Sequence, residues 1–295
     1  MTQDAEGLLW WLISFLLVGL AAFPAQAAFE FVGQGARSTA LGGAYVAAVQ
    51  TAEAVWYNPA GNARADQWLA GTTHLRLYPN VDRSPSLNAL NGAGPLWGGG
   101  LQAGLSLLGA PGWREEVATL AYGRALHPRI ALGGGLNTKA WKAGNLSRRV
   151  WSVDLGALYE VGWIHPLVYL RLGLVGRNLT RPNIAVGGQD AGQTPRAVVL
   201  AAAFVLAEQE FLVDLERSGG RTALRAGYET RTVSLAGARF RFGGSAMGPN
   251  WSNKELDVGL GHDWKQWHFD YAYTYSLHLT ELGGGHRLSV GYRTR

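Results

Sequence analysis

Apolar and polar side chains alternate with a period of two along much of this chain. In the segment 267–279, seven successive odd positions carry aromatic rings or leucine, and the even positions between them are mostly polar. Side chains of a β-strand point alternately to its two faces, so this pattern predicts a strand with one apolar and one polar face. An α-helix would spread the same rings around its circumference.

The same alternation recurs in the segments 151–161, 198–206, 256–260 and 288–292. The alternating segments run to about 9–13 residues, against roughly 9–11 for a membrane-spanning strand and roughly 5–6 for an average soluble strand. Aromatic rings gather near their ends, as they do at the two interfaces of membrane barrels. The pattern favours a transmembrane barrel, with a periplasmic or secreted β-sandwich as the alternative.

The sequence therefore predicts an all-β fold, a transmembrane antiparallel β-barrel of about 14 strands. The weakest predicted strand, 85–93, is included because bacterial single-chain barrels have an even number of strands. The predicted strands are 68–78, 85–93, 99–108, 114–126, 129–141, 150–161, 166–177, 196–206, 210–217, 222–229, 232–242, 255–264, 267–278 and 286–294.

The connections between these strands are predicted to be short at one end of the barrel and longer at the other. Such barrels have short periplasmic turns and longer outer loops, so we expect the long loops to be extracellular and the first and last residues of the barrel to be periplasmic. The predicted short turns are His127–Pro128, Gly162–His165, Ala207–Gln209, Glu229–Arg231 and Lys265–Gln266. The predicted long loops are 142–149, 178–195, 243–254 and 279–285.

An apolar run at residues 8–23 is shorter than the ~20 residues that a transmembrane helix needs, and an Ala-x-Ala site follows it. We therefore predict a secretory signal peptide over 1–27, although its first residues carry Asp4 and Glu6 rather than basic residues. An uncleaved anchor is the alternative. A signal peptide followed by a transmembrane β-barrel indicates the outer membrane of a diderm bacterium.

Residues 28–67 are rich in small side chains and do not alternate, so we expect them to form a hatch in the barrel lumen, with the barrel over 68–295. The motif Asn58, Pro59, Ala60 and Gly61 predicts a helix start, with Asn58 as N-cap and Pro59 in the first helical position. The glycine runs 98–100 and 133–135 lack the Lys-Ser/Thr of a phosphate loop and predict close packing against such a plug.

Charged residues make up only 16% of the chain, against roughly 25% in soluble domains, which supports the membrane assignment. The absence of Cys excludes disulfides and thiolate sites. The net charge is +5, but the Arg residues are scattered rather than arranged in a stripe, so no nucleic-acid partner is expected.

The polar residues at the even positions of 267–279, together with those of the next predicted strand, 286–294, predict a polar lumen wall. Groups at i and i+2 on a strand lie ~6.6 Å apart, too far for a catalytic triad, so we predict neither an enzyme nor a cofactor. A metal site at His262, Asp263 and His268 is the weaker alternative. An inferred register places Asp270 opposite Arg293. The predicted polar lumen residues are His268, Asp270, His278, Arg287 and Arg293.

Five segments together resemble the PorV/PorQ family within the FadL-like (OMPP1/FadL/TodX) superfamily. They are 35–37 (GAR), 41–47 (LGGAYVA), 55–61 (VWYNPAG), 176–179 (GRNL) and 285–293 (GHRLSVGYR). The resemblance implies an outer-membrane barrel of 14 strands with an amino-terminal hatch. Where the family commonly ends in an aromatic residue, this chain ends in Thr294-Arg295.

The resemblance implies a secretion-associated, type IX-like protein that binds cargo or acts as a scaffold. The alternative is a FadL-like channel that takes up hydrophobic small molecules. The partners it implies are outer-membrane lipid, the barrel assembly machinery, and either secretion-system components or a hydrophobic ligand.

Overall fold

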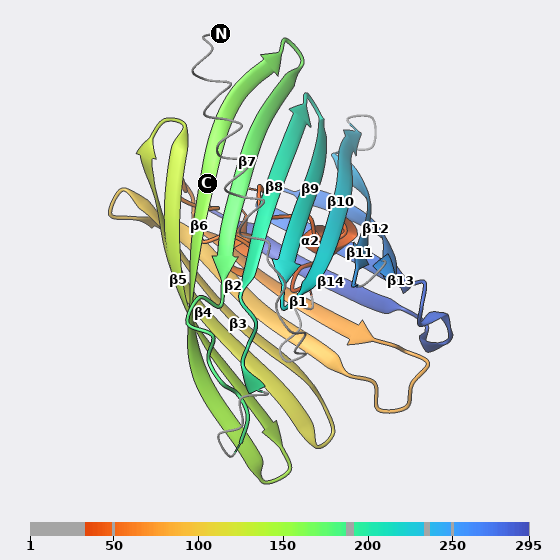
Figure 1. Ribbon diagram of the computed structural model, residues 1–295. Coiled ribbons are helices and arrows are strands. Elements are labelled where there is room, and N and C mark those ends of the chain that lie inside the picture. The colour runs from red at the N-terminus through yellow and green to blue at the C-terminus, as the bar shows by residue number, and fades with distance from the viewer. Residues whose placement is uncertain (1–32, 49–50, 187–191, 233–236, 249–250, 295) are drawn as a thin grey trace.

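The computed structural model describes residues 33–48, 51–186, 192–232, 237–248 and 251–294. Fourteen antiparallel strands form one closed barrel, in which β1 pairs with β14 and all other strands pair with their neighbours in sequence (Figure 1). The strands are β1 (Leu69–Leu77), β2 (Ser86–Leu96), β3 (Gly99–Ala110), β4 (Trp113–His127), β5 (Ile130–Ala143), β6 (Leu146–His165), β7 (Val168–Arg177), β8 (Ala197–Leu206), β9 (Gln209–Ser218), β10 (Arg221–Thr232), β11 (Ala238–Met247), β12 (Asn253–Trp264), β13 (Trp267–Ser276) and β14 (Gly285–Arg293).

The all-β barrel and its strand number are confirmed, including the weak strand at β2. Within the described ranges, no helix has the length and hydropathy needed to cross a membrane. The signal peptide predicted over 1–27 lies outside the described residues.

Four predicted connections are wrong, all because polar residues or glycine were interpreted as loop. The predicted long loop at 243–254 is reduced to 248–252, because β11 continues to Met247 and β12 begins at Asn253. The predicted long loop at 142–149 is a hairpin closed by the two residues between β5 and β6, with Gly144 at φ 56°. The predicted turn at Gly162–His165 belongs to β6, where the register shifts twice and Gly162 (φ 95°) marks a bulge. The predicted turn at Glu229–Arg231 is strand, because β10 continues to Thr232.

The two ends of the barrel differ in their connections. At one end, called the short-turn end, two-residue turns join β2 to β3, β4 to β5, β6 to β7, β8 to β9 and β12 to β13. The other end, called the long-loop end, carries the connections 78–85, 178–196, 248–252 and 277–284, the last with the short helix η5 (Thr280–Leu282). Both β1 and β14 have their outer chain ends at the short-turn end.

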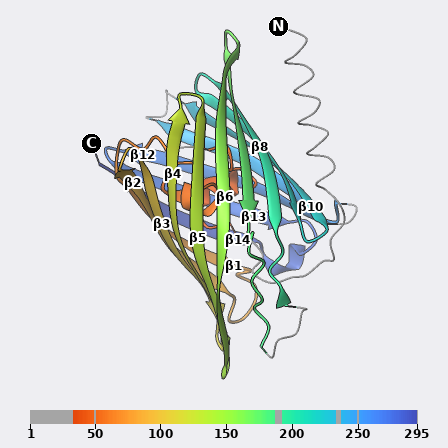
Figure 2. The same cartoon turned by 60° about the vertical axis from the view of Figure 1, so that its left-hand side comes forward.

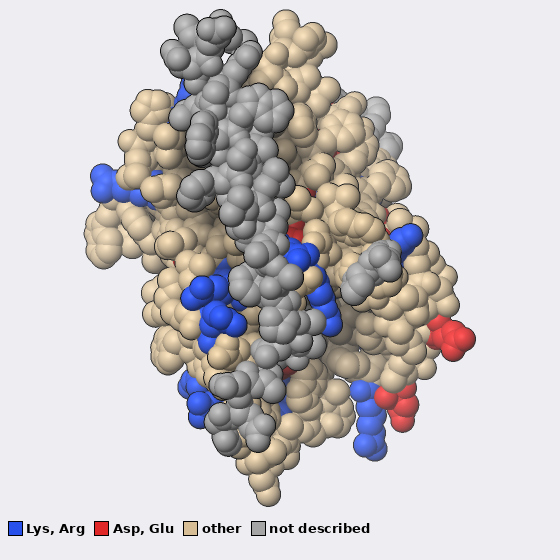
Figure 3. Space-filling model, viewed as in Figure 1, with Lys and Arg blue, Asp and Glu red and all other residues tan. Residues whose placement is uncertain are grey.

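The outer face of the barrel is apolar. Along β12, for example, Leu256, Val258 and Leu260 are exposed, whereas the alternate side chain of Asp257 is buried. Uncharged residues make up most of the face seen in Figure 3. Large exposed aromatic side chains gather at the short-turn end, as expected at a membrane interface: Trp68, Trp97, Trp163, Trp264, Trp267 and Tyr292.

Residues 33–48 and 51–67, called the luminal segment, lie inside the ring of strands, as Figures 1 and 2 both show. The segment contains the helix α2 (Ala36–Ala40) and the 3-10 helix η1 (Ala52–Trp56). α2 contacts β11 to β14, and η1 contacts β1 to β4, so the segment reaches both sides of the barrel. Its buried side chains, among them Leu41, Tyr45 and Tyr57, form the main core with the inner wall.

Candidate functional site

The motif Asn58–Gly61 lies against the inner wall but does not begin a helix. Asn58 Oδ1 accepts from the Ala60 amide at 2.9 Å, which caps a turn, and the next residues form further single turns. Asn58 Nδ2 donates to the carbonyls of Val46 (2.8 Å) and Ala157 on β6 (3.3 Å). The predicted helix is therefore wrong, and Asn58 instead joins two parts of the luminal segment to the wall.

Glycines on the inner wall provide the space in which this turn sits. A Cβ added to Gly156 would lie 2.1 Å from Asn58 Oδ1, and one added to Gly133 would lie 2.4 Å from the Pro59 carbonyl carbon. At Gly100 it would lie 1.8 Å from the Asn62 carbonyl oxygen. Real Cβ atoms do not approach other atoms this closely, so the wall needs glycine where the luminal backbone approaches it.

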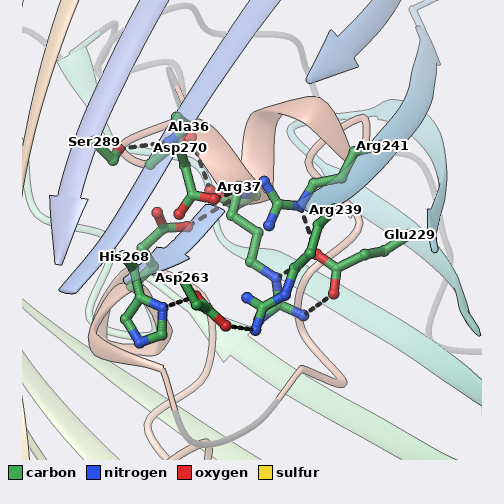
Figure 4. Close-up of polar contacts among 12 residues, drawn as sticks. Ala36, Arg37, Glu229, Arg239, Arg241, Asp263, His268, Asp270 and Ser289 are labelled. Carbon is green, nitrogen blue, oxygen red and sulfur yellow. Dashed lines mark hydrogen bonds and ion pairs between the residues drawn. The ribbon is translucent and has the colours of Figure 1, made fainter. Parts of the chain in front are cut away.

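Charged groups hold α2 against the wall near the short-turn end (Figure 4). Arg37 Nε lies 2.9 Å from Glu229 Oε2 on β10, and Arg37 Nη2 lies 3.2 Å from Glu210 Oε2 on β9. Arg241 on β11, which is fully buried, bridges Glu229 Oε2 at 2.5 Å and Asp270 Oδ1 on β13 at 2.7 Å. Removing one member of such a buried network would leave an uncompensated charge, typically at a cost of about 3–5 kcal/mol.

Two further contacts fix the amino-terminal turn of α2. The Ala36 amide donates to Ser289 Oγ on β14 at 2.9 Å, and the Ser38 amide donates to Glu53 Oε2 at 3.1 Å. Burial raises the pKa of the Glu53 carboxyl, and the charge of Asp270 raises it further. Because a raised carboxyl pKa favours the neutral form, this group prefers to be protonated more than a solvated Glu does.

The structure places four of the five predicted lumen residues on the inner face. His268 forms a pair with Asp263, Asp270 pairs with Arg241, and Arg287 donates to Thr274 Oγ1 at 3.0 Å. Arg293 also lines the lumen, at the short-turn end.

The fifth predicted lumen residue, His278, lies two residues beyond the end of β13, in the loop, and is exposed. The predicted pair of Asp270 with Arg293 is wrong as well. β13 and β14 pair with Asp270 opposite Ser289, four residues from the inferred register, because the hairpin is centred two residues earlier in the chain than the sequence indicated. Arg293 lies opposite Leu69 on β1 instead.

The alternative metal site is not assembled. His262 is exposed on the outer face of β12, whereas Asp263 and His268 face the lumen. Asp263 is held by Arg239 as well as by His268. In the part of the chain that the structure describes, no group of three or more His, Cys, Asp or Glu residues could hold a metal ion.

The luminal segment lies between two chambers of different character. The short-turn chamber has a volume of about 570 Å³ and is lined largely by polar and charged groups, including Arg37, Glu210, Glu229, Arg239 and Asp270. The long-loop chamber has a volume of about 370 Å³. These volumes fall within or near the range of roughly 300–1,000 Å³ that is typical of small-molecule sites.

The long-loop chamber has an apolar side and a charged side. Its apolar side consists of Val55, Trp56, Leu77, Leu87, Leu108 and Val117, from η1 and β1 to β4. Its charged side includes Lys139, Asp154, Arg177, Glu216 and Arg225, from β5 to β10. Arg225 Nη1 lies 2.8 Å from Glu216 Oε2, so part of this charge is neutralised within the wall.

Several of these residues were not singled out by the sequence. Arg241 and Asp214 occupy inner positions of alternating segments, and Asp214 Oδ2 accepts from the amides of Tyr45 (2.9 Å) and Val46 (3.1 Å). The alternation could have identified them as lumen residues. Their partners could not be identified from the sequence. The partners of Asp214 lie more than 150 positions away, and those of Arg241 lie on two other strands, β10 and β13.

No protein-family model matches the chain, and no curated protein matches its sequence. Solved structures of hydrocarbon channels do match its fold. The monoaromatic hydrocarbon channel CymD superimposes with a TM-score of 0.65 at 13% identity, covering 90% of this chain and 98% of that one.

Two further solved structures have a similar fold. The toluene transporter TbuX of Ralstonia pickettii gives a TM-score of 0.63 at 12% identity, covering 91% of this chain and 100% of that one. A FadL homologue of Pseudomonas aeruginosa gives 0.58 at 12% identity, covering 92% and 99%. The chain thus has a FadL-like barrel fold, whereas membership of the PorV/PorQ family is not shown.

Proposed function

We propose that this protein is a non-enzymatic channel that admits small hydrophobic molecules through the outer membrane of a diderm bacterium. The observation that carries the proposal is the long-loop chamber, where apolar side chains of η1 and β1 to β4 line a cavity beneath the long loops. The FadL-like fold, shared with hydrocarbon channels, supports the same conclusion.

In this proposal the luminal segment is a hatch. It separates the two chambers, and both chambers are lined in part by its own residues, such as Glu53 on one side and Trp56 on the other. Passage of a molecule then requires the segment to shift against the wall. The polar and ionic contacts of α2 would retain it between passages.

The secretion-associated function was the first expectation from the sequence, and the structural similarities favour the channel over it. The structures that resemble the chain over about 90% of its length include a monoaromatic hydrocarbon channel and a toluene transporter. The secretion function rested on the resemblance of sequence segments alone. We therefore retain the channel as the proposed function.

The test is uptake of radiolabelled toluene by diderm cells that express the protein, compared with cells that carry the empty vector. We expect faster toluene uptake and no change in the uptake of a hydrophilic solute of similar size. Equal acceleration of both solutes would indicate an unselective pore. Unchanged toluene uptake, with the protein folded in the outer membrane, would refute the proposal.

A further inference from the structure

Two residues that line the long-loop chamber carry a buried hydrogen-bond donor without a partner. The donors are the indole Nε1 of Trp56, whose side chain is 7% exposed, and the amide Nδ2 of Asn137, which is 5% exposed. Both residues line the chamber, as does Gln34, whose Oε1 is a buried acceptor without a partner. Buried donors are nearly always satisfied in folded proteins, so two such donors beside one cavity indicate a ligand that accepts hydrogen bonds.

The two donors are held in place by their surroundings. A Cβ on Gly104 would lie 2.5 Å from the Trp56 ring, so this glycine lets the ring lie flat against β3. Gly104 pairs across the sheet with Thr119, and Thr119 pairs with Asn137. Thr119 Oγ1 donates to Asn137 Oδ1 at 2.6 Å, which fixes the amide and leaves Nδ2 without a partner.

The rest of the chamber defines the other part of the ligand. Leu87, Leu108 and Val117 provide an apolar wall next to Trp56, suited to a hydrocarbon body. A hydrocarbon by itself would leave both donors unsatisfied, at the expense of binding affinity.

The cations of the chamber already have partners, which disfavours an anionic ligand. Lys139 Nζ donates to Asn178 Oδ1 at 2.7 Å, and Arg225 lies 2.8 Å from Glu216. Arg287 donates to the Gly33 carbonyl at 3.2 Å and to Thr274. A carboxylate would have to displace these contacts and would also lie close to the acidic groups of the wall.

We propose that the long-loop chamber binds small apolar molecules that carry one uncharged oxygen, such as alkylphenols, with Trp56 and Asn137 donating hydrogen bonds to that oxygen. A phenol stays protonated at pH 7, as the tyrosine side chain does. The inference rests on the proposed channel function and makes its substrate class specific. It adds a polar recognition element that distinguishes oxygenated aromatics from plain hydrocarbons.

The test uses a matched set of probes, 4-ethylphenol, ethylbenzene and 4-ethylbenzoate, titrated calorimetrically into the full-length protein in detergent. We expect 4-ethylphenol to bind about tenfold more tightly than ethylbenzene, the effect of one or two hydrogen bonds. Equal binding of these two probes, or tighter binding of 4-ethylbenzoate, would overturn the inference.

Two variants assign the preference to the proposed donors. Trp56→Phe keeps an aromatic ring and removes the N–H, and Asn137→Leu removes the amide. Each should reduce the preference for 4-ethylphenol about three- to tenfold and leave ethylbenzene binding unchanged. The matched control is Asn91→Leu, which changes a buried wall asparagine of the short-turn chamber and should leave the preference intact. A preference that survives both variants would overturn the inference.

Uptake measurements separate this inference from the proposed function. If ethylbenzene is taken up but 4-ethylphenol and ethylbenzene bind equally, the channel function stands and the oxygen recognition is wrong. If neither 4-ethylphenol nor ethylbenzene binds and neither is taken up, both proposals are wrong. Folding of every variant is checked by the mobility of the unheated barrel in detergent gels.

Discussion

Single glycines determine where the luminal segment can lie. Gly156 on β6 and Gly133 on β5 are cross-strand neighbours, and both face the turn at Asn58 and Pro59. Gly134 is the next residue of β5 after Gly133, but it points outward. A Cβ added there would meet only Leu155 Cδ2, at 3.7 Å. Adjacent glycines of one strand therefore have different physical functions.

This difference predicts opposite outcomes for two substitutions. Gly156→Val should destabilise the protein by about 1–3 kcal/mol, because its Cβ would overlap the Asn58 and Pro59 side chains, and hydrogen bonds hold the Asn58 amide in place. Gly134→Val should be neutral or slightly stabilising, because valine suits an exposed strand position. Urea unfolding from lipid vesicles measures both, and similar destabilisation by the two variants would contradict the assignment of the faces.

Each strand presents one face to the lumen and one face to the outside. On β12, Val258 is exposed on the outer face near the middle of the strand. On β8, Val205 lines the short-turn chamber and lies opposite Glu210 on β9. The two valines thus occupy similar strands but opposite environments.

Replacing each valine by arginine should reveal the environment directly. Val258→Arg should reduce the stability of the membrane-inserted barrel by roughly 2–4 kcal/mol, the cost of a cation near the bilayer midplane. Val205→Arg should be tolerated, because its side chain can pair with Glu210 in a polar chamber. Folding into vesicles at increasing urea gives both values. Equal losses would show that the outer face of β12 is not in contact with lipid.

The whole molecule consists of a closed wall with a segment packed inside it, and the proposed channel needs that segment to move. The chain contains no cysteine, so two introduced cysteines can form a disulfide only with each other within the chain. Ala36 N lies 2.9 Å from Ser289 Oγ. That direct contact makes the pair a candidate for a disulfide, which joins Cα atoms roughly 4.4–6.8 Å apart.

The variant Ala36→Cys/Ser289→Cys should therefore lock α2 to β14. We expect oxidised protein to lose most of its toluene uptake and to recover it after reduction. Each single-cysteine variant is the control and should not respond to the reductant. Full uptake by the oxidised double variant, with the disulfide verified by mass spectrometry, would show that α2 does not have to leave β14 during transport.

The sequence alone determined the barrel and the faces of its strands, because these follow from local periodicity. The alternation along 267–279 required only that neighbouring side chains point to opposite sides, and β13 has its apolar face outside as that pattern predicts. The glycines at 100 and 133 were likewise identified as sites of close approach, and the luminal turn lies against them.

Only the tertiary structure decided how the strands extend and which side chains meet. Strand register depends on pairing between segments, so Asp270 contacts Arg241 rather than Arg293, and the predicted loop at 142–149 continues the strand ladder. Asn58 caps a turn rather than a helix, and that turn lies directly against glycines of the wall. The unpartnered donors of Trp56 and Asn137 come from segments about 80 residues apart, and only folding brings them to one chamber.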